Sequence, residues 1–216
     1  MQKTSLRRSR LICRGVLAHR DLVQDTTETM SDFTALTNQL LIAMPNLADP
    51  NFYRTVTLIC EHSTEGAMGI VINRTTELAL CDILQQMGID TKKTKKREMP
   101  VHLGGPVQTN RGFVVHEPLG KWESTLPITD TLGVSTSRDI LAAIAENKGP
   151  DRCMVALGYA GWGAGQLERE IVENSWLNGP VDRQIIFDTP VERRWQSAAT
   201  LVGVDLSTLS GDAGHA

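Results

Sequence analysis

The sequence predicts an α+β fold with a largely antiparallel or mixed sheet, and three observations carry this prediction. Short apolar runs typical of strands come first, at 40–44, 56–60 and 69–73, and follow one another so that neighbouring runs can pair. Helical patterns, with apolar residues three and four positions apart, are interleaved with strands only later in the chain. No internal repeat is visible in the sequence, so a repeating βαβ array is not favoured.

The first strands form a predicted hairpin. The strand at 40–44 stops at Pro45, because the residue before proline favours extended backbone and proline cannot donate to a ladder. After a turn-rich loop, 56–60 alternates as a strand does, and Thr64-Glu65-Gly66 turns the chain. The run 69–73 should therefore return antiparallel as the second arm of the hairpin.

The middle of the chain is expected to hold two helices and three further strands. One helix should begin after an N-cap at Thr76 and the other after an N-cap at Ser137. Strands are predicted near 101–103 and 112–116. The continuous apolar run 153–157 suits a strand that is buried on both faces.

The last third is expected to contain a helix, a strand and a second helix. Leu167 and Ile171 place one apolar stripe on a helix whose other positions are mostly charged. Alternating apolar residues at 181–187 predict a strand. The second helix is predicted from Thr189-Pro190-Val191-Glu192, a capping box with proline at the first helical position.

The first 29 residues differ in composition from the rest of the chain, with a start rich in arginine and lysine. A secretory signal needs an unbroken apolar core of about 7–15 residues. Leu11-Ile12-Cys13 is broken at once by Arg14. We therefore expect 1–29 to be a disordered tail and 30–216 to be a single domain, with Met30 as a natural start.

Composition excludes several classes of protein. The chain has 216 residues, of which 41% are hydrophobic and 22% charged, as in a globular protein with a real core. The formal net charge of -3 gives no overall attraction to nucleic acids or acidic membranes. No apolar run approaches the roughly 18–20 residues of a membrane-spanning helix. Because Cys13, Cys60, Cys81 and Cys153 are scattered, free and mostly buried thiols in a reducing compartment are expected.

The stretch 158–168 is the most informative local feature, with four glycines in eight residues between a strand and a helix. A glycine inside a regular element costs about 0.5–1 kcal/mol relative to alanine. Either the backbone takes positive φ there, or another group comes too close for a Cβ atom. One interpretation is a functional surface with Trp162 as an exposed aromatic. The other is that the glycines let Tyr159 and Trp162 pack tightly at the base of the loop.

A phosphate-binding loop fits this stretch poorly. Gly161-x-Gly163 is followed by Gly165 rather than by a glycine three positions on, and no Lys-Ser or Lys-Thr follows. Glu168 and Glu170 would place negative charge in the first turn of the helix, which repels a phosphate. Nucleotide binding is therefore not expected.

The dispersed cysteines and histidines do not specify a reactive site. Strand alternation places Cys60 and His62 on one face, and His102, His116 and Cys153 could join them in space. Nothing in their spacing requires zinc, so a buried thiol and surface imidazoles are favoured. No cysteine has a local nucleophile signature, and no Gly-x-Ser-x-Gly elbow is present. We expect no catalytic residue, no metal and no cofactor.

One basic run, Lys92-Lys93-Thr94-Lys95-Lys96-Arg97, lies outside the tail. It has neither interleaved aromatic residues nor the pattern of a recognition helix. The run is predicted to be a solvated loop, and specific DNA binding is not expected.

Several motifs, taken in order, resemble those of the bacterial AlgH/YqgE family. They are Leu47-Ala48-Asp49-Pro50-Asn51-Phe52, Glu61-His62, Glu65-Gly66-Ala67-Met68-Gly69, Val71-Ile72-Asn73, Gly104-Gly105-Pro106, the stretch 158–168, and Asn174-Ser175-Trp176-Leu177. The resemblance runs from about Leu36 to Leu206 and leaves out 1–29 and 92–97. It implies one cytoplasmic α+β domain, with a bifurcated sheet curled toward a pseudo-barrel and helices around it. The family carries the label of a transcriptional regulator and has no agreed catalytic residues.

Two kinds of function remain open after this resemblance. The favoured one is a non-enzymatic regulatory or binding protein of the cytosol with an unknown protein or small-molecule partner. The alternative is an enzyme with a small-molecule pocket at the glycine-rich stretch. A deep polar pocket with convergent Glu and His would favour the enzyme, and a shallow apolar patch would favour a protein partner. The candidate binding surface comprises Gly161, Trp162, Gly163, Gly165, Gln166, Glu168, Asn51, Glu61 and His62.

Overall fold

The computed structural model describes residues 35–206. The predicted tail over 1–29, the start at Met30 and Cys13 lie outside the described residues. The described residues all belong to one compact unit.

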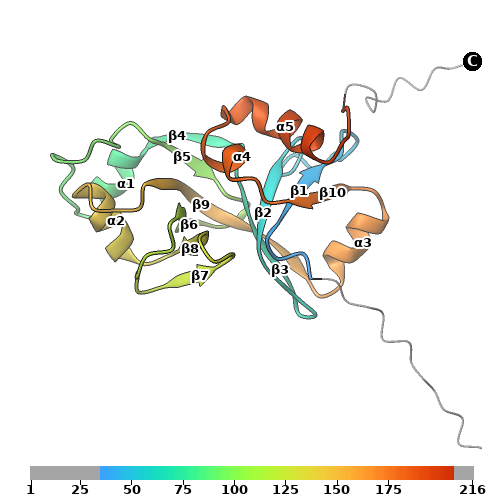
Figure 1. Ribbon diagram of the computed structural model, residues 1–216, viewed down its shortest axis with the longest axis horizontal. Helices are drawn as coiled ribbons and strands as arrows, with labels where there is room; N and C mark the ends of the chain where they lie inside the picture. Colours follow the sequence, from blue (N-terminus) through green and yellow to red (C-terminus); the bar gives the residue numbers. More distant parts are fainter. Residues whose placement is uncertain (1–34, 207–216) are drawn as a thin grey trace, which may run out of the picture. The chain divides into compact units, whose positions relative to one another are not determined.

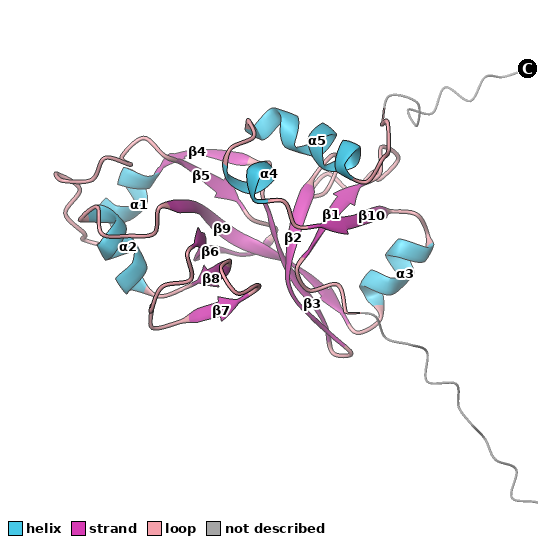
Figure 2. Ribbon diagram, in the orientation of Figure 1, coloured by secondary structure: helices cyan, strands magenta, loops and turns pink. Residues whose placement is uncertain are grey.

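Ten strands form a single sheet in the described chain, and five α-helices and one 3₁₀ turn accompany it (Figures 1 and 2). The strands are β1 (Gln39–Ala43), β2 (Val56–Ser63), β3 (Gly66–Val71), β4 (Thr75–Ala79), β5 (Pro100–Leu103), β6 (Val107–Glu117), β7 (Thr125–Pro127), β8 (Gly133–Ser135), β9 (Arg152–Gly163) and β10 (Trp176–Pro180). The helices are α1 (Leu80–Gln86), α2 (Arg138–Ala145), α3 (Gln166–Val172), α4 (Arg183–Phe187) and α5 (Arg194–Leu201), with the 3₁₀ turn η1 at Val191–Arg193. The predicted α+β class is confirmed.

The sheet is mixed, and its pairing branches at β9. The main path runs β10-β1-β2-β3-β9-β6-β8-β7, with β4 and β5 off this path. Along its first half β9 lies between β6, which is antiparallel, and β5, which is the parallel neighbour. Along its last residues β9 pairs with β3 instead, with Met68 opposite Gly161. The continuous apolar run in the first half of β9 is buried on both faces, as predicted, because Met154 and Ala156 pack in one apolar cluster and Val155 packs in another.

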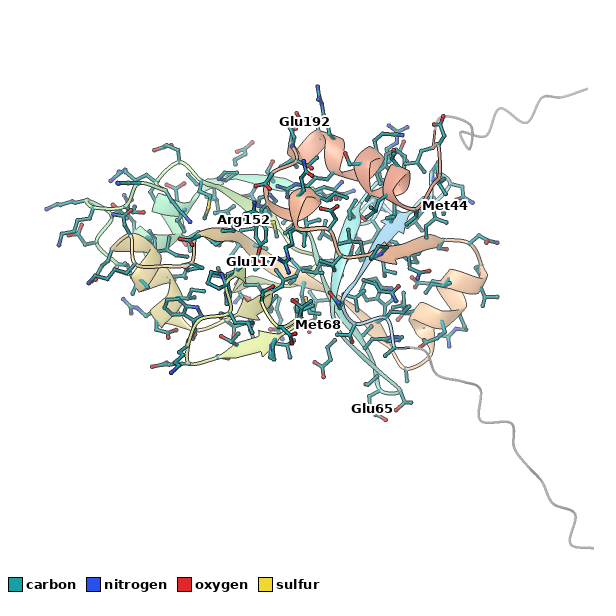
Figure 3. The ribbon with its side chains drawn as sticks, viewed as in Figure 1. Met44, Glu65, Met68, Glu117, Arg152 and Glu192 are labelled. Atoms are coloured by element: carbon teal, nitrogen blue, oxygen red, sulfur yellow. The ribbon has the colours of Figure 1, made fainter. Side chains whose placement is uncertain are left out.

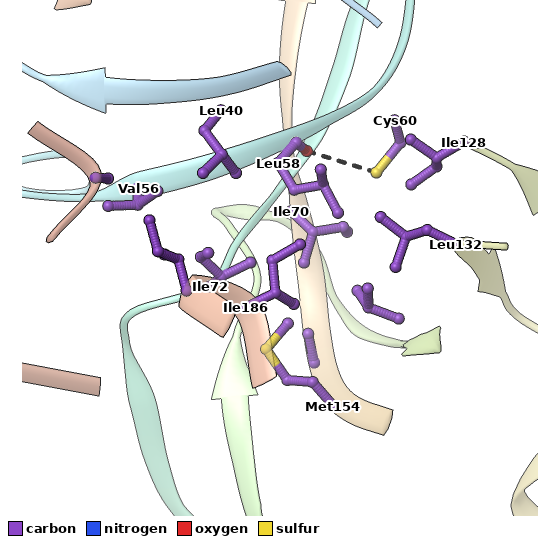
Figure 4. Packing of buried hydrophobic residues seen from close by; sticks show 14 of the residues in the cluster. Leu40, Val56, Leu58, Cys60, Ile70, Ile72, Ile128, Leu132, Met154 and Ile186 are labelled. Atoms are coloured by element: carbon purple, nitrogen blue, oxygen red, sulfur yellow. Dashed lines mark hydrogen bonds between the residues drawn. The ribbon is translucent and has the colours of Figure 1, made fainter. Parts of the chain in front are cut away.

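Buried apolar side chains form three clusters around this sheet. The largest joins strands β1, β2, β3 and β9 to helices α4 and α5, and Figure 4 shows Leu58, Ile70 and Ile186 within it. A second lies under α1 and α2, around Leu80 and Ile140. Burying such side chains stabilises the fold by roughly 1.5–3 kcal/mol each.

One predicted element needs correction. The predicted strand at 181–187 is wrong, because α4 occupies most of it. The carboxylate of Asp182 accepts the backbone N–H groups of Gln184 and Ile185 and so caps that helix. The strand of this region, β10, ends just before it. A short apolar run fits the two-residue repeat of a strand as well as the ~3.6-residue repeat of a helix, and here the Asp182 cap favours the helix.

Two predicted helix caps also differ from those observed, whereas Ser137 is the N-cap residue of α2, as predicted. Thr76 lies in β4 and donates to the Val101 carbonyl, while α1 begins after Ala79. Thr189 donates to the Gln184 carbonyl instead of closing a capping box. The chain therefore enters α5 through η1, although the helix itself is confirmed.

Candidate functional site

The glycine-rich stretch is mostly strand, not loop, because β9 continues to Gly163. Gly158 has φ +73°, and an added Cβ would lie 2.5 Å from the Gly105 carbonyl oxygen. Gly165 has φ +66° and is the N-cap residue of α3. Gly161 and Gly163 have φ outside the left-handed region. Positive φ therefore explains only two of the four glycines.

A β-bulge in β2 decides which side chains meet the end of β9. The pairing of β2 with β3 shifts between Ile59 and Glu61, so Cys60 is the extra residue. Cys60 packs in the largest cluster with Leu58, whereas His62 turns to the opposite face. The prediction that Cys60 and His62 share a face is wrong, because one inserted residue reverses the alternation.

Strands β2, β3 and β9 lie side by side here, and their register forms two rows of side chains, one on each face of the sheet. Glu61, Met68 and Gly161 form one row, and His62, Ala67 and Trp162 form the other. We call these the glycine face and the tryptophan face. The predicted site residues are thus divided between the two faces.

Aromatic rings fill the tryptophan face. Trp162 is only 5% exposed, so the prediction of an exposed aromatic is wrong. Its ring stacks against Phe52, with centroids 6.0 Å apart, and meets Trp176 edge-on at 5.9 Å. Such pairs stabilise a core by about 0.5–1.5 kcal/mol beyond their area burial. Trp162 therefore acts as a core residue.

Glu170 organises the hydrogen bonds of this face. The indole N–H groups of Trp162 and Trp176 both donate to its Oε2, at 3.0 and 2.8 Å. Gln166 donates its amide to the Oε1 atom of Glu170 at 2.8 Å and accepts the Gly163 N–H at 3.0 Å. Sequence reasoning missed this role of Glu170, which depends on Trp176 folding back from the next strand.

His62 and Glu168 meet as a linked pair between β2 and α3. The Nδ1 atom of His62 accepts the Leu36 backbone N–H at 2.9 Å. The proton is therefore on Nε2, which donates to the Oε1 atom of Glu168 at 2.8 Å. With both ring nitrogens engaged and the side chain 1% exposed, His62 has no nitrogen available for a metal or a substrate.

The glycine face borders a groove of about 750 Å³. One wall is formed by the β2–β3 hairpin and the end of β9, and the other by strands β6, β7 and β8. We call this space the groove. Figure 3 shows Glu65 at the tip of that hairpin and Met68 farther along it. The groove is lined by Glu61, Ser63, Glu65, Gly66, Ala67, Met68, Val107, Arg111, Phe113, Ser124, Leu126, Val134, Thr136, Tyr159, Gly161 and Trp162. Its volume is within the range of binding sites for small ligands and peptide side chains.

Gly161 keeps this groove open. It is exposed, and the nearest atom to an added Cβ would be Cε2 of Tyr159 at 3.3 Å. The Tyr159 ring meets Phe113 edge-on at 5.7 Å, and the guanidinium of Arg111 lies 5.4 Å over the Phe113 ring. A larger residue at 161 would therefore fill space that is otherwise open.

The charges of the groove lie on opposite walls. Glu61 and Glu65 are exposed on the β2–β3 side, and Arg111 is exposed on the β6 side. Among the described residues none of these three side chains forms an ion pair. Asn51, the remaining predicted residue, lies elsewhere and borders a separate depression with Arg74.

The other histidines and cysteines hold structural positions. His62, His102 and His116 are all buried, so the prediction of surface imidazoles is wrong for the described histidines. Burial, with the nearby Arg194 charge, lowers the pKa of His102 to about 4. Burial raises the pKa of Cys60 to about 12. The His102 imidazole and the Cys60 thiol are therefore held uncharged at neutral pH.

Neither a metal site nor a membrane span was found in the part of the chain that the structure describes. No group of three or more His, Cys, Asp or Glu residues there could hold a metal ion. Within residues 35–206 no helix has the length and apolar character that crossing a membrane requires.

Comparison with known proteins gave consistent matches. A family model, DUF179, described as AlgH-like, matches residues 40–207. A UPF0301 protein of Thioalkalivibrio sulfidiphilus is 57% identical over 187 residues, which cover 87% of this chain and 100% of the relative. Another, from Methylococcus capsulatus, is 55% identical and covers 86% of this chain and 98% of the relative.

Solved structures match over the same region. The solution structure of the AlgH protein from Pseudomonas aeruginosa has a TM-score of 0.71 and 48% identity, covering 85% of this chain and 97% of that one. A crystal structure of a Corynebacterium diphtheriae protein has a TM-score of 0.66 at 20% identity, covering 84% and 94% of the two chains. At that identity the second match supports the fold alone.

Proposed function

The chain belongs to the AlgH-like family, and from this premise we propose that it is a non-enzymatic binding protein of the cytoplasm whose groove receives a protein partner. The observation that carries the proposal is that the polar side chains of the tryptophan face bond to one another, whereas the glycine face borders an open groove. The groove is open, its lining mixes apolar with polar side chains, and its charged side chains lie on the walls without an ion pair among the described residues; this suits a protein surface better than a small substrate. The free thiols Cys60, Cys81 and Cys153 are consistent with a reducing compartment.

The alternative of an enzyme at the glycine-rich stretch has weaker support. Acid–base chemistry would need a histidine or a carboxylate with a suitable partner inside the pocket. The Glu and His side chains that do converge are His62 and Glu168, which lie on the tryptophan face and bond to each other. The groove itself brings Glu61, Glu65 and Tyr159 together without a histidine or a cysteine.

Site-specific DNA binding is not part of this proposal. Of the basic run at 92–97, Lys96 is bound to the carbonyls of Pro150 and Asp151, both at 3.1 Å. The remaining basic side chains can support only weak electrostatic contact. A site-specific regulator should bind its own DNA site about 10³-fold or more tightly than nonspecific DNA at physiological salt. If the purified full chain showed a preference of that size, this part of the proposal would be overturned.

The proposed function is tested by filling the groove. Gly161→Met places a side chain into the open space at the groove floor. Gly112→Met is the control, because Gly112 is also a strand glycine but borders a different cavity, and an added Cβ there would have no atom within 4 Å. The full chain and both variants would be expressed with the same tag in a bacterium that naturally carries the protein and purified gently for native mass spectrometry.

A protein that copurifies with the wild type and with Gly112→Met, but not with Gly161→Met, would support the proposal. Retention of the same partner by Gly161→Met would refute it. A retained small molecule that the protein consumes on incubation would favour the enzyme instead.

A further inference from the structure

The end of β9 presents a strand edge to the groove. The Gly163 N–H points to the side chain of Gln166, on the side away from β3. The Trp162 carbonyl points the other way, since an added Cβ on Gly66 of β3 would lie 2.3 Å from its oxygen. Alternate residues of a strand direct their N–H and C=O groups to the same edge. The N–H and C=O of Gly161 therefore also face away from β3.

No strand of residues 35–206 pairs with this edge at Gly161. The neighbour on that side is β6, whose pairing with β9 goes no farther than Val107 opposite Tyr159. An edge with free backbone groups is a template for another extended chain. The lack of a side chain at Gly161 lets such a chain approach the backbone closely.

The surroundings of this edge determine what an added chain should carry. Tyr159 is partly exposed and, with its ring held edge-on against the buried Phe113, offers aromatic surface for apolar side chains that project from alternate positions of a strand. Glu61 and Glu65 are exposed on one wall and have no ion pair among the described residues. A lysine or arginine side chain is the complement of these carboxylates.

We propose that the partner binds as an extended peptide segment that adds to β9 at Gly161 and places a lysine or arginine side chain against Glu61 and Glu65. This inference rests on the proposed function and specifies how the groove would be used. Backbone pairing with β9 supplies the register of the segment, and the aromatic wall and the carboxylates supply its specificity.

The probe is a library of random peptides of about nine residues, long enough to cross the groove as a strand, selected against the full-length protein. The enriched sequences should carry Lys or Arg at one fixed position and apolar residues at alternate positions. A synthetic copy of an enriched peptide would then be N-methylated at one amide at a time. Strand addition predicts a period of two, in which methylation of every second amide abolishes binding and methylation of the others leaves it nearly intact.

Variants of the protein test the charge. The double variant Glu61→Gln, Glu65→Gln should weaken binding of the enriched peptide by about three- to tenfold, and less at high salt. Glu173→Gln is the matched control, since it removes an exposed carboxylate from the C-terminal end of α3 outside the groove lining. It should leave the affinity unchanged.

The outcomes separate this inference from the proposed function. If Gly161→Met loses the cellular partner but the selected peptides show no period of two, the groove binds its partner by another geometry and strand addition is refuted. A preference for acidic peptides would refute the assigned role of Glu61 and Glu65. If Gly161→Met keeps the cellular partner and still binds the peptides, both proposals fail.

Discussion

The glycine face and the tryptophan face belong to the same three strands, yet their polar side chains are used in opposite ways. On the tryptophan face, Glu170 accepts three side-chain hydrogen bonds and His62 uses both ring nitrogens. On the glycine face, Glu61 and Glu65 have no ion pair within the described chain and border an open groove. A face whose polar groups bond to one another supports the fold, whereas a face with free charges can bind a partner.

The bulge in β2 creates this difference. If Cys60 were paired regularly instead of forming the bulge, the alternation of the strand would point Glu61 toward the aromatic cluster and His62 into the groove. The groove would then contain an imidazole, and a carboxylate would need partners among buried rings. Bulges are known to redirect side chains next to functional sites.

Trp162→Ala is expected to have the largest effect. Removing this buried indole leaves a cavity beside Phe52 and Trp176 and takes one donor from Glu170. Replacing a buried tryptophan by alanine costs about 3–5 kcal/mol in the free energy of unfolding. Urea denaturation measures this value, and Trp162→Phe, which keeps a ring, should lose clearly less. A loss below about 1 kcal/mol for Trp162→Ala would mean that the indole is not a core group.

Much of the fold could be predicted from the sequence because periodicity and turn residues are local signals. The strands at β1, β2 and β3 and the helices α1, α2, α3 and α5 were found in this way. The sequence predicts a strand where α4 lies, because its five residues include three consecutive apolar ones, Ile185, Ile186 and Phe187, which fit either period. Short strands such as β7 and β8 carry too few residues to show a pattern.

The site was only partly predictable. The glycine-rich stretch and Glu61 do border the groove, but the sequence could not show which face each residue would occupy. That depends on the bulge at Cys60, which no local pattern in the sequence marks, and on the return of Trp176 in β10. The opposite wall of the groove, including Phe113 and Arg111, is brought in by long-range pairing of β6 with β9.

Glu170→Gln is expected to have the next largest effect. One oxygen of the Glu170 carboxylate accepts the two indole N–H groups, and the other accepts the Gln166 amide N–H. A glutamine at 170 has only one acceptor oxygen, so its own NH₂ group would face one of these donors. If Gln166 turns to compensate, the Gly163 N–H loses its acceptor. Leaving a buried group unsatisfied costs about 1–3 kcal/mol, and because the exposed Gly163 N–H can bond to water instead, we expect a loss of about 1 kcal/mol. Chemical denaturation checks the value, with Glu173→Gln on the same helix as a control expected to change little.

Glu168→Gln is expected to be nearly silent. A glutamine can still accept the His62 Nε2–H through its side-chain oxygen, and Glu168 is partly exposed, so stability should stay within about 0.5 kcal/mol. Because the pair lies on the tryptophan face, the partner bound in the groove should be retained. Loss of that partner at unchanged stability would move the functional surface to the tryptophan face and break the comparison.

The smallest effect is expected for Gly163→Ala, which tests whether the glycines of the glycine face are required by the backbone. Its φ lies outside the left-handed region, and the only atom within 4 Å of an added Cβ is Oε1 of Gln166 at 3.8 Å. The reduced flexibility of the unfolded chain should therefore offset most of any loss, and stability should change by less than about 0.5 kcal/mol. Gly158→Ala is the contrasting control, because its positive φ and the 2.5 Å contact with Gly105 should cost more than about 1 kcal/mol. If both variants were destabilised equally, backbone strain would account for the whole glycine-rich stretch. If only Gly158→Ala is destabilised, the backbone does not require a glycine at 163, and positive φ at Gly158 is a separate, structural requirement of the stretch.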